Sequence, residues 1–188
     1  RAFVATYVKK GATQGGSSLT QQYVKNVLLL QAQEDNDPIA EYHASEETVA
    51  RKLREMLIAV QMEKTYSKLE ILQGYLNIAQ FGRGIYGVEM AARRYFSTTA
   101  DKLDIVQAAT IAAITKNPAA FDPSVESNQE ASQRERNIVL DLMYQEKCIS
   151  QKQRDEAKAK PLKDTLKLQD AQAGCSASGD AAFFCDYV

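Results

Sequence analysis

The spacing of apolar residues along this chain predicts helices. Between about residues 46 and 63, apolar side chains recur every three or four positions and form one stripe, with charged residues outside it. A second segment from about 67 to 80 has the same spacing, and the Ser67 hydroxyl is placed to cap its start. The two stripes consist of Val49, Leu53, Met56, Leu57 and Val60, and of Leu69, Leu72, Leu76 and Ala79.

The rest of the chain continues this pattern. Short alternating runs of β-branched residues are rare, whereas Ala, Leu, Gln, Glu and Lys recur throughout, so the sequence predicts an all-α fold. The acidic segment 31–47 contains Pro38 and the single histidine, His43, and is predicted to be a mobile loop with a surface histidine. Further helices are predicted over about 17–30, 88–96, 103–116, 126–147 and 150–160.

Composition narrows the class of protein. The chain has 188 residues, of which 45% are hydrophobic and 25% charged, as in a globular domain with a proper core. Its net charge is −1, and basic residues do not form a stripe with interleaved aromatics, which disfavours nucleic-acid binding. No apolar run approaches the roughly 18–20 residues that span a bilayer.

Residues 15–26, with the sequence GGSSLTQQYVKN, carry the first candidate site. A tight turn that leads into a helix presents unpaired backbone N–H groups, and the helix dipole favours an anion there. If the helix begins at Ser18, then Gln22 and Lys25 follow on the same face and offer an amide and an ammonium group. This face suits a polyanionic or sugar ligand. The alternative is an ordinary polar N-cap followed by a solvated face.

A second candidate is Glu55, which lies four residues after Arg51 and three after Lys52. Two nearby cations favour the ionised carboxylate, which can orient cations or ligate a metal but is poorly suited to donate a proton. The alternative is a routine surface pair worth a few tenths of a kcal/mol.

The cysteines leave two alternatives open. Cys175 and Cys185 bracket a short Ser/Gly/Ala stretch that a disulfide could close, which would imply an oxidising compartment, or they stay unpaired. The chain offers no second Cys or His pair to complete a zinc site, and the state of Cys148 is left open.

Three segments together resemble the motifs of peptidoglycan glycosyltransferases, glycosyltransferase family 51. Residues 16–26 resemble the G-x-S-T-x-T-Q-Q-x-x-K-N motif, and residues 51–55, RKLRE, match R-K-x-x-E. Residues 68–77, KLEILQGYLN, match K-x-x-I-L-E-x-Y-L-N, with Gln73 at the usual glutamate position. The order and spacing agree over about residues 11–160. The tail resembles the linker to the transpeptidase domain in class A penicillin-binding proteins of actinobacterial type, so domains are expected at 1–162 and 163–188.

The resemblance implies a lysozyme-like helical glycosyltransferase domain at the extracytoplasmic face of the cytoplasmic membrane, anchored by a segment absent from these residues. Such enzymes polymerise lipid II into glycan strands, release undecaprenyl pyrophosphate and bind moenomycin. Their pyrophosphate site, carried over to this sequence, would include a divalent cation (Mg or Mn), and the setting also favours a Cys175–Cys185 disulfide. Glu55 would support the leaving-group side, and substrate would be bound by Lys25, Gln22, Ser18, Asn26, Arg51 and Lys52, with Ser18 in place of the family's threonine.

One departure concerns the catalytic base. In the family, the base is the glutamate of an E-D-x-x-F-x-x-H-x-G motif upstream of the Gln-Gln motif, whereas here the first acidic residue is Glu34. The sequence therefore predicts a domain that begins after this motif and cannot polymerise lipid II alone. Two alternatives are a lysozyme-like hydrolase, for which Glu55 between cations has the wrong environment, and a non-catalytic helical interaction module.

Overall fold

The computed structural model describes residues 17–169, which divide at Ala79/Gln80 into two compact units. The N-terminal unit comprises residues 17–79 and the C-terminal unit residues 80–169, and each is described by itself. Cys175 and Cys185 lie outside the described residues, while Cys148 is exposed and forms no disulfide within them. Among residues 17–169, no helix is both long enough and apolar enough to cross a lipid bilayer.

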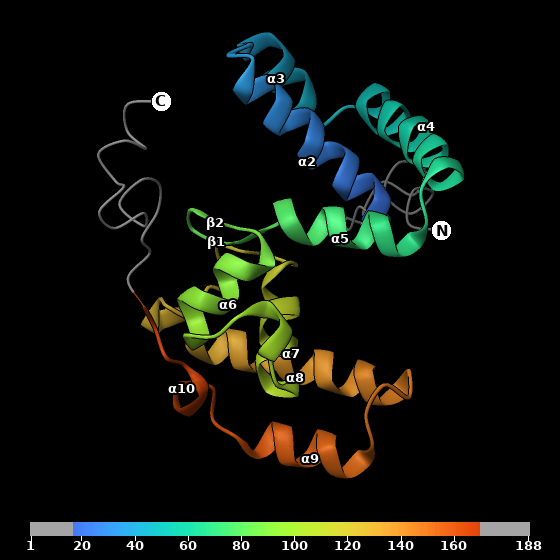
Figure 1. The fold of residues 1–188 in the computed structure, drawn as a ribbon. Coiled ribbons are helices and arrows are strands. Elements are labelled where there is room, and N and C mark those ends of the chain that lie inside the picture. Colours follow the sequence, from blue (N-terminus) through green and yellow to red (C-terminus); the bar gives the residue numbers. More distant parts are fainter. Residues whose placement is uncertain (1–16, 170–188) are drawn as a thin grey trace. The chain divides into compact units, whose positions relative to one another are not determined.

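The N-terminal unit is built around one central helix, α2, which packs against the other three (Figure 1). Each helix starts at a side chain that accepts a hydrogen bond from a free backbone N–H group, as N-caps do. The helices are α2 (Leu19–Glu34), α3 (Pro38–Ser45), α4 (Val49–Thr65) and α5 (Lys68–Ile78), and their caps are Ser18, Asp37, Thr48 and Ser67.

The predicted mobile loop at 31–47 is wrong. Helix α2 continues to Glu34, and α3 begins after a turn in which Asn36 has a positive φ of 50°. The Asp37 carboxylate accepts hydrogen bonds from two backbone N–H groups at the start of α3, and Pro38 occupies the first helical position. A proline there loses no hydrogen bond and has a φ suited to a helix, so Pro38 starts α3.

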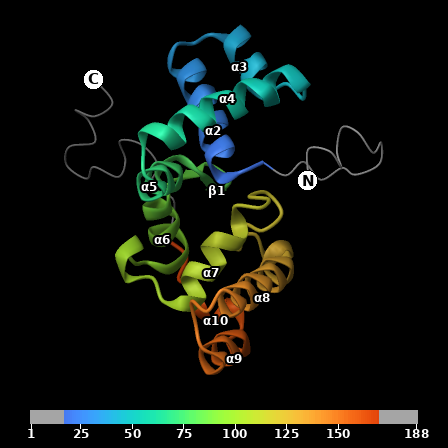
Figure 2. The ribbon, with the colours of Figure 1, turned by 90° about the vertical axis from the view of Figure 1, so that its right-hand side faces the viewer.

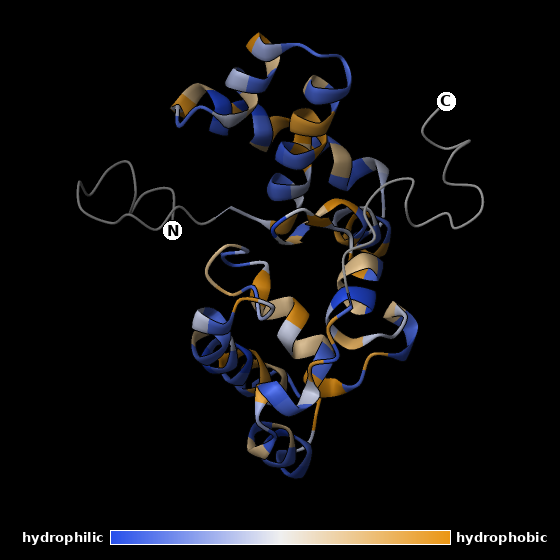
Figure 3. Ribbon diagram, turned by 90° about the vertical axis from the view of Figure 1, so that its left-hand side faces the viewer, coloured by the Kyte–Doolittle hydropathy of each residue, from blue (hydrophilic) through white to orange (hydrophobic). Residues whose placement is uncertain are grey.

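Helix α4 does not bury its apolar stripe. Leu57 is 70% exposed and the other four stripe residues are exposed as well (hydropathy is shown in Figure 3). The buried positions are Arg51, Glu55 and Ala59, which lie one turn apart and face the rest of the N-terminal unit. The helix was predicted from its periodicity, but the face it buries is a charged one. In α5, the buried residues Ile71 and Tyr75 likewise lie beside the predicted stripe, whose Leu69 is exposed.

The C-terminal unit (Figure 2) is also helical, apart from a two-stranded antiparallel ribbon, labelled β1 and β2 in Figure 1, that pairs Gln80 with Tyr86 and Gly82 with Ile85. This ribbon is not among the elements that the sequence predicted. Helix α8 packs against α7, α9 and α10. The elements are β1 (Gln80–Gly82), β2 (Ile85–Tyr86), α6 (Val88–Phe96), the 3₁₀ turn η1 (Ala100–Lys102), α7 (Ile105–Ile114), the 3₁₀ turn η2 (Glu126–Asn128), α8 (Gln129–Gln145), α9 (Gln151–Ala159) and α10 (Leu162–Thr165).

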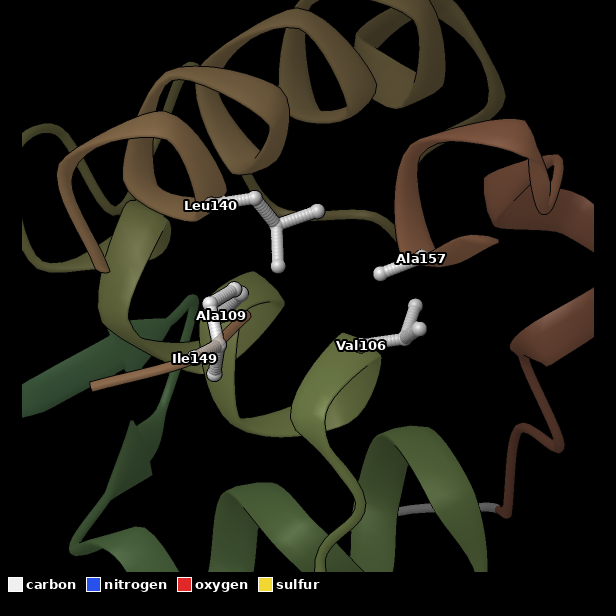
Figure 4. Packing of buried hydrophobic residues seen from close by; sticks show 5 residues of the cluster. All are labelled: Val106, Ala109, Leu140, Ile149 and Ala157. Carbon is white, nitrogen blue, oxygen red and sulfur yellow. The ribbon is translucent and has the colours of Figure 1, made fainter. Parts of the chain in front are cut away.

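The core of this unit lies between α7, α8 and α9. Figure 4 shows the Leu140 side chain pointing from α8 into the space bounded by Val106 and Ala109 on α7 and Ala157 on α9. Ile149, from the turn before α9, completes the cluster. Small alanine side chains let these helices approach closely, which explains why the Ala-rich sequence of α7 forms a central helix.

A buried tyrosine ties the strand β1 to the rest of this unit. The Tyr95 hydroxyl lies 2.7 Å from the carbonyl oxygen of Phe81 and 3.1 Å from Asp122 Oδ1. Asp122 in turn accepts hydrogen bonds from the backbone N–H groups of Arg83 and Ser124. Burial, together with the negative charge of Asp122, raises the pKa of the Tyr95 hydroxyl, so the tyrosine stays protonated.

Candidate functional site

The first turn of α2 has the predicted helix start. Ser18 is the N-cap, and its hydroxyl accepts a hydrogen bond from the Gln21 backbone N–H at 3.2 Å. The Gln21 side chain reciprocates by accepting from the Ser18 N–H at 2.9 Å, which completes a capping box. Because a hydroxyl is both donor and acceptor, the Ser18 O–H proton is left to donate to a ligand.

On α4, two cations hold the candidate carboxylate from both sides. Arg51 donates to Glu55 Oε1 and to the carbonyl oxygen of Glu46, while Lys52 Nζ lies 3.2 Å from Glu55 Oε2. Glu55 is 1% exposed and Arg51 is 7% exposed. The alternative of a routine surface pair is therefore wrong, because the carboxylate is buried and both of its oxygens accept from a cation.

Lys52 also links this cluster to the start of α2. Its ammonium group donates to the Ser17 hydroxyl at 2.8 Å, directly before the Ser18 cap. The structure therefore brings together the helix N-terminus and the Arg51–Lys52–Glu55 cluster, a proximity that sequence spacing left open. With two cations and one carboxylate beside the positive end of a helix dipole, the surroundings favour an anion.

The remaining predicted substrate-binding residues lie further along α2. Gln22 is exposed, and its amide oxygen accepts a hydrogen bond from the Tyr75 hydroxyl of α5 at 3.3 Å. Lys25 and Asn26 are half-buried. Lys25 follows Ser18 by two helical turns, about 10 Å along the axis, and no hydrogen bond or ion pair joins its ammonium group to another residue within 17–169. Their roles stay predictions.

Sequence reasoning missed a second link between α2 and α4. Thr20, buried in the first turn of α2, donates its hydroxyl proton to Glu63 Oε1 at 2.6 Å. Glu63 follows Glu55 by eight residues, so the two lie close to the same face of α4. The spacing of Glu55 and Glu63, together with the position of Thr20 inside the Gln-Gln motif, was the sequence feature that could have pointed to this contact.

A cavity of about 330 Å³ adjoins the buried ion pair between α2, α3 and α4. Its walls combine apolar side chains with charged groups, including Arg54, which the motifs did not mark. His43 lies at its rim, 52% exposed, with Nδ1 3.3 Å from Glu46 Oε1, in agreement with the predicted surface histidine. The lining residues are Leu28, Asp37, Ile39, Ala40, His43, Ala44, Arg51, Arg54 and Glu55.

The described residues do not fit a resident divalent cation. Within 17–169, no three His, Cys, Asp or Glu side chains gather so that they could hold a metal ion. Both oxygens of Glu55, the carboxylate that the sequence analysis considered able to ligate a metal, accept from Arg51 and Lys52.

Comparison with known proteins identifies the family. The family model described as "Transglycosylase" matches residues 1–144, and the chain therefore belongs to the transglycosylase family. This assignment and the helical structure confirm the predicted all-α, lysozyme-like glycosyltransferase class.

Individual relatives agree with the family assignment. The chain is 37% identical over 164 residues to penicillin-binding protein 1A/1B of Bacillus subtilis (strain 168), covering 87% of the chain and 16% of that protein. It is 39% identical over 140 residues to penicillin-binding protein 1A of Mycobacterium tuberculosis, covering 74% and 16%. The chain thus spans about a sixth of the length of these relatives.

A crystal structure of penicillin-binding protein 1A from Haemophilus influenzae aligns with 82% of the chain and 18% of that protein, at 22% identity and a TM-score of 0.46.

Proposed function

We propose that this chain forms the leaving-group side of a peptidoglycan glycosyltransferase, which polymerises lipid II into glycan strands and releases undecaprenyl pyrophosphate. The observation that carries the proposal is the position of Lys52, whose ammonium group contacts both the Ser17 hydroxyl and Glu55 Oε2. This contact places a cation-rich cluster beside the N-terminus of α2.

Charge stabilisation is the chemistry that this arrangement supports. When the bond from the sugar to the pyrophosphate breaks, negative charge builds up on the departing phosphate oxygens. Lys25, Lys52 and the backbone N–H groups at the start of α2 would bind those oxygens more strongly as the charge grows, which lowers the barrier. Glu55 would orient Arg51 and Lys52, since an ionised carboxylate held by two cations is not a proton donor.

The acceptor side of the reaction needs a general base within hydrogen-bond reach of the attacking sugar hydroxyl. The 188 residues contain no match to the family's E-D-x-x-F-x-x-H-x-G motif. We therefore expect the 188-residue chain to bind donor-like ligands without polymerising lipid II. Glycan synthesis by the purified chain would contradict this expectation.

The partners follow from the same proposal: lipid II, the growing lipid-linked strand, moenomycin-type inhibitors and the extracytoplasmic surface of the cytoplasmic membrane. The exposed apolar stripe of α4 supports a membrane surface as a partner. The actinobacterial type stays a prediction, because the relatives include a Bacillus as well as a Mycobacterium protein. A divalent cation (Mg or Mn) also stays a prediction, which rests on the family resemblance alone.

The test is binding of inorganic pyrophosphate and of moenomycin to the chain, measured by titration calorimetry. Lys25→Ala should weaken both at least tenfold, because it removes the predicted phosphate contact. Lys64→Ala, which removes an exposed lysine in the last turn of α4, is the matched control and should change neither. Equal binding by the wild-type chain and Lys25→Ala would contradict the proposed site.

A further inference from the structure

Several hydrogen bonds join the start of α2 to another helix. Of those described, the one between Thr20 and Glu63 is the shortest. The Thr20 hydroxyl lies 2.6 Å from Glu63 Oε1, and Thr20 is 6% exposed. Such a short O–H···O⁻ distance is typical of a charge-assisted hydrogen bond, which is stronger than a neutral one. Because Thr20 is buried, water cannot readily replace the carboxylate as its partner.

We propose that Glu63 is a positioning residue for the pyrophosphate site. Acting through Thr20, it fixes the first turn of α2 relative to α4, the helix that carries Arg51, Lys52 and Glu55. The inference rests on the proposed function of that site and names a residue that the family motifs in this sequence do not mark.

Two attachment points explain why Glu63 matters for orientation. Lys52 holds Ser17, and Glu63 holds Thr20 three residues further along. On α4 the two anchoring residues are eleven positions apart, which is about 16 Å along a helix. One contact fixes a point on α2, whereas two contacts from well-separated positions also fix the angle between the helices. The direction of the α2 N–H groups at the bound anion depends on that angle.

The experiment compares variants that break the Thr20–Glu63 hydrogen bond with variants that keep it. Thr20→Val and Glu63→Ala remove the donor or the acceptor, and we expect inorganic pyrophosphate to bind about tenfold more weakly to each. Thr20→Ser keeps the hydroxyl, and Glu63→Gln keeps an acceptor oxygen, so both should bind within about threefold of the wild type. The double variant Thr20→Val/Glu63→Ala should bind no more weakly than either single variant, because one bond is lost in all three.

A matched control separates positioning from general stability. Thr110 is a fully buried threonine in α7 of the C-terminal unit, and its hydroxyl donates to the Val106 carbonyl at 2.7 Å. Thr110→Val should lower the unfolding temperature and leave pyrophosphate affinity unchanged. All affinities are measured well below the unfolding temperature of each variant.

The outcomes distinguish this inference from the proposed function. If the wild-type chain does not bind pyrophosphate, both are overturned. If Lys25→Ala abolishes binding while Thr20→Val and Glu63→Ala bind like the wild type, only the positioning role is overturned. Binding by Glu63→Gln as weak as that by Glu63→Ala would also overturn it, because the acceptor oxygen is retained.

Discussion

Arg51 and Glu55 lie one turn apart on α4 and form an ion pair that is buried within the N-terminal unit. At the same spacing on a helix surface, such a pair contributes only a few tenths of a kcal/mol. Burial changes its significance, because a buried charge that loses its partner has neither water nor a counter-ion to compensate it. The pair is thus better understood as a requirement of the site than as a source of stability.

Removal of Arg51 should be costly for this reason. We expect Arg51→Ala to lower the free energy of unfolding by about 3 kcal/mol, at the lower end of the usual range because Lys52 still pairs with Glu55. The control is Arg93→Ala, which breaks the exposed i,i+4 pair with Glu89 and should cost less than about 1 kcal/mol. Urea unfolding followed by circular dichroism measures both, and equal costs would contradict the argument from burial.

Gly74 should not tolerate a larger side chain. A Cβ at this position in α5 would lie 2.4 Å from the hydroxyl oxygen and 2.6 Å from the Cζ of Tyr23, so the ring would have to move. We expect Gly74→Ala to destabilise the N-terminal unit by about 1–3 kcal/mol, despite the higher helix propensity of alanine.

A double-mutant cycle checks the cause of this effect. In a Tyr23→Ala background the clash is absent, and Gly74→Ala should then stabilise the chain by up to about 1 kcal/mol through helix propensity. Thermal or urea unfolding gives the four free energies. A loss of stability in both backgrounds would show that Tyr23 is not the cause.

The Tyr95 hydroxyl should make stability depend on pH in the alkaline range. Its pKa in the folded chain is raised above the ordinary value of 10.0 by burial and by Asp122, so the unfolded chain loses this proton first. Above about pH 10 the unfolded state therefore binds fewer protons than the folded state, and stability falls as pH rises. Below pH 9 Tyr95 contributes no pH dependence.

Substitution isolates the contribution of Tyr95 from that of other alkaline groups. Tyr95→Phe should be less stable at pH 7, because Asp122 loses a hydrogen-bond donor, but its stability should decline less between pH 9 and pH 11. Tyr86→Phe, which changes an exposed tyrosine, should keep the wild-type slope. Parallel slopes for Tyr95→Phe and the wild type would refute the assignment.

The exposed stripe of α4 should contribute to membrane binding. We expect Leu57→Gln to reduce co-sedimentation with vesicles severalfold, because it removes apolar area that would enter the interface. Its unfolding temperature should change little, since Leu57 is 70% exposed. Leu142→Gln, at an exposed leucine of α8, is the control, and an equal reduction in both variants would argue against a specific role of α4.

Hydrophobic periodicity predicted where the helices lie better than it predicted which face each one buries. The start of α5 after Ser67 and the bounds of α6 were predicted correctly, because caps and glycines act locally. The buried face of α4 was not predictable from a pattern that places hydrophobic residues inside, since Arg51 and Glu55 bury each other as a pair. Pro38 was misread because a proline that ends one helix and a proline that starts the next look alike in a sequence.

The site was predictable where its parts lie within one helix. The i,i+4 spacing of Arg51 and Glu55 predicted their pairing, and the helix predicted over about 17–30 begins at the Ser18 cap. The contacts of Lys52 with Ser17 and of Glu63 with Thr20 join positions more than thirty residues apart, and no local pattern encodes such distances. The roles of Lys25, Gln22 and Asn26 toward a ligand remain predictions from the family motif.

The turn between α2 and α3 also has a kinetic consequence. Only three residues separate the two helices. The Asp37 cap and the positive φ of Asn36 set the direction in which the chain turns from α2 into α3. Closing so short a segment costs little chain entropy, whereas the contact of α2 with α5 must close a loop of more than fifty residues between Gln22 and Tyr75. The α2–α3 corner should therefore form early during folding. The first turn of α2, held by residues distant in sequence, would reach its final position late.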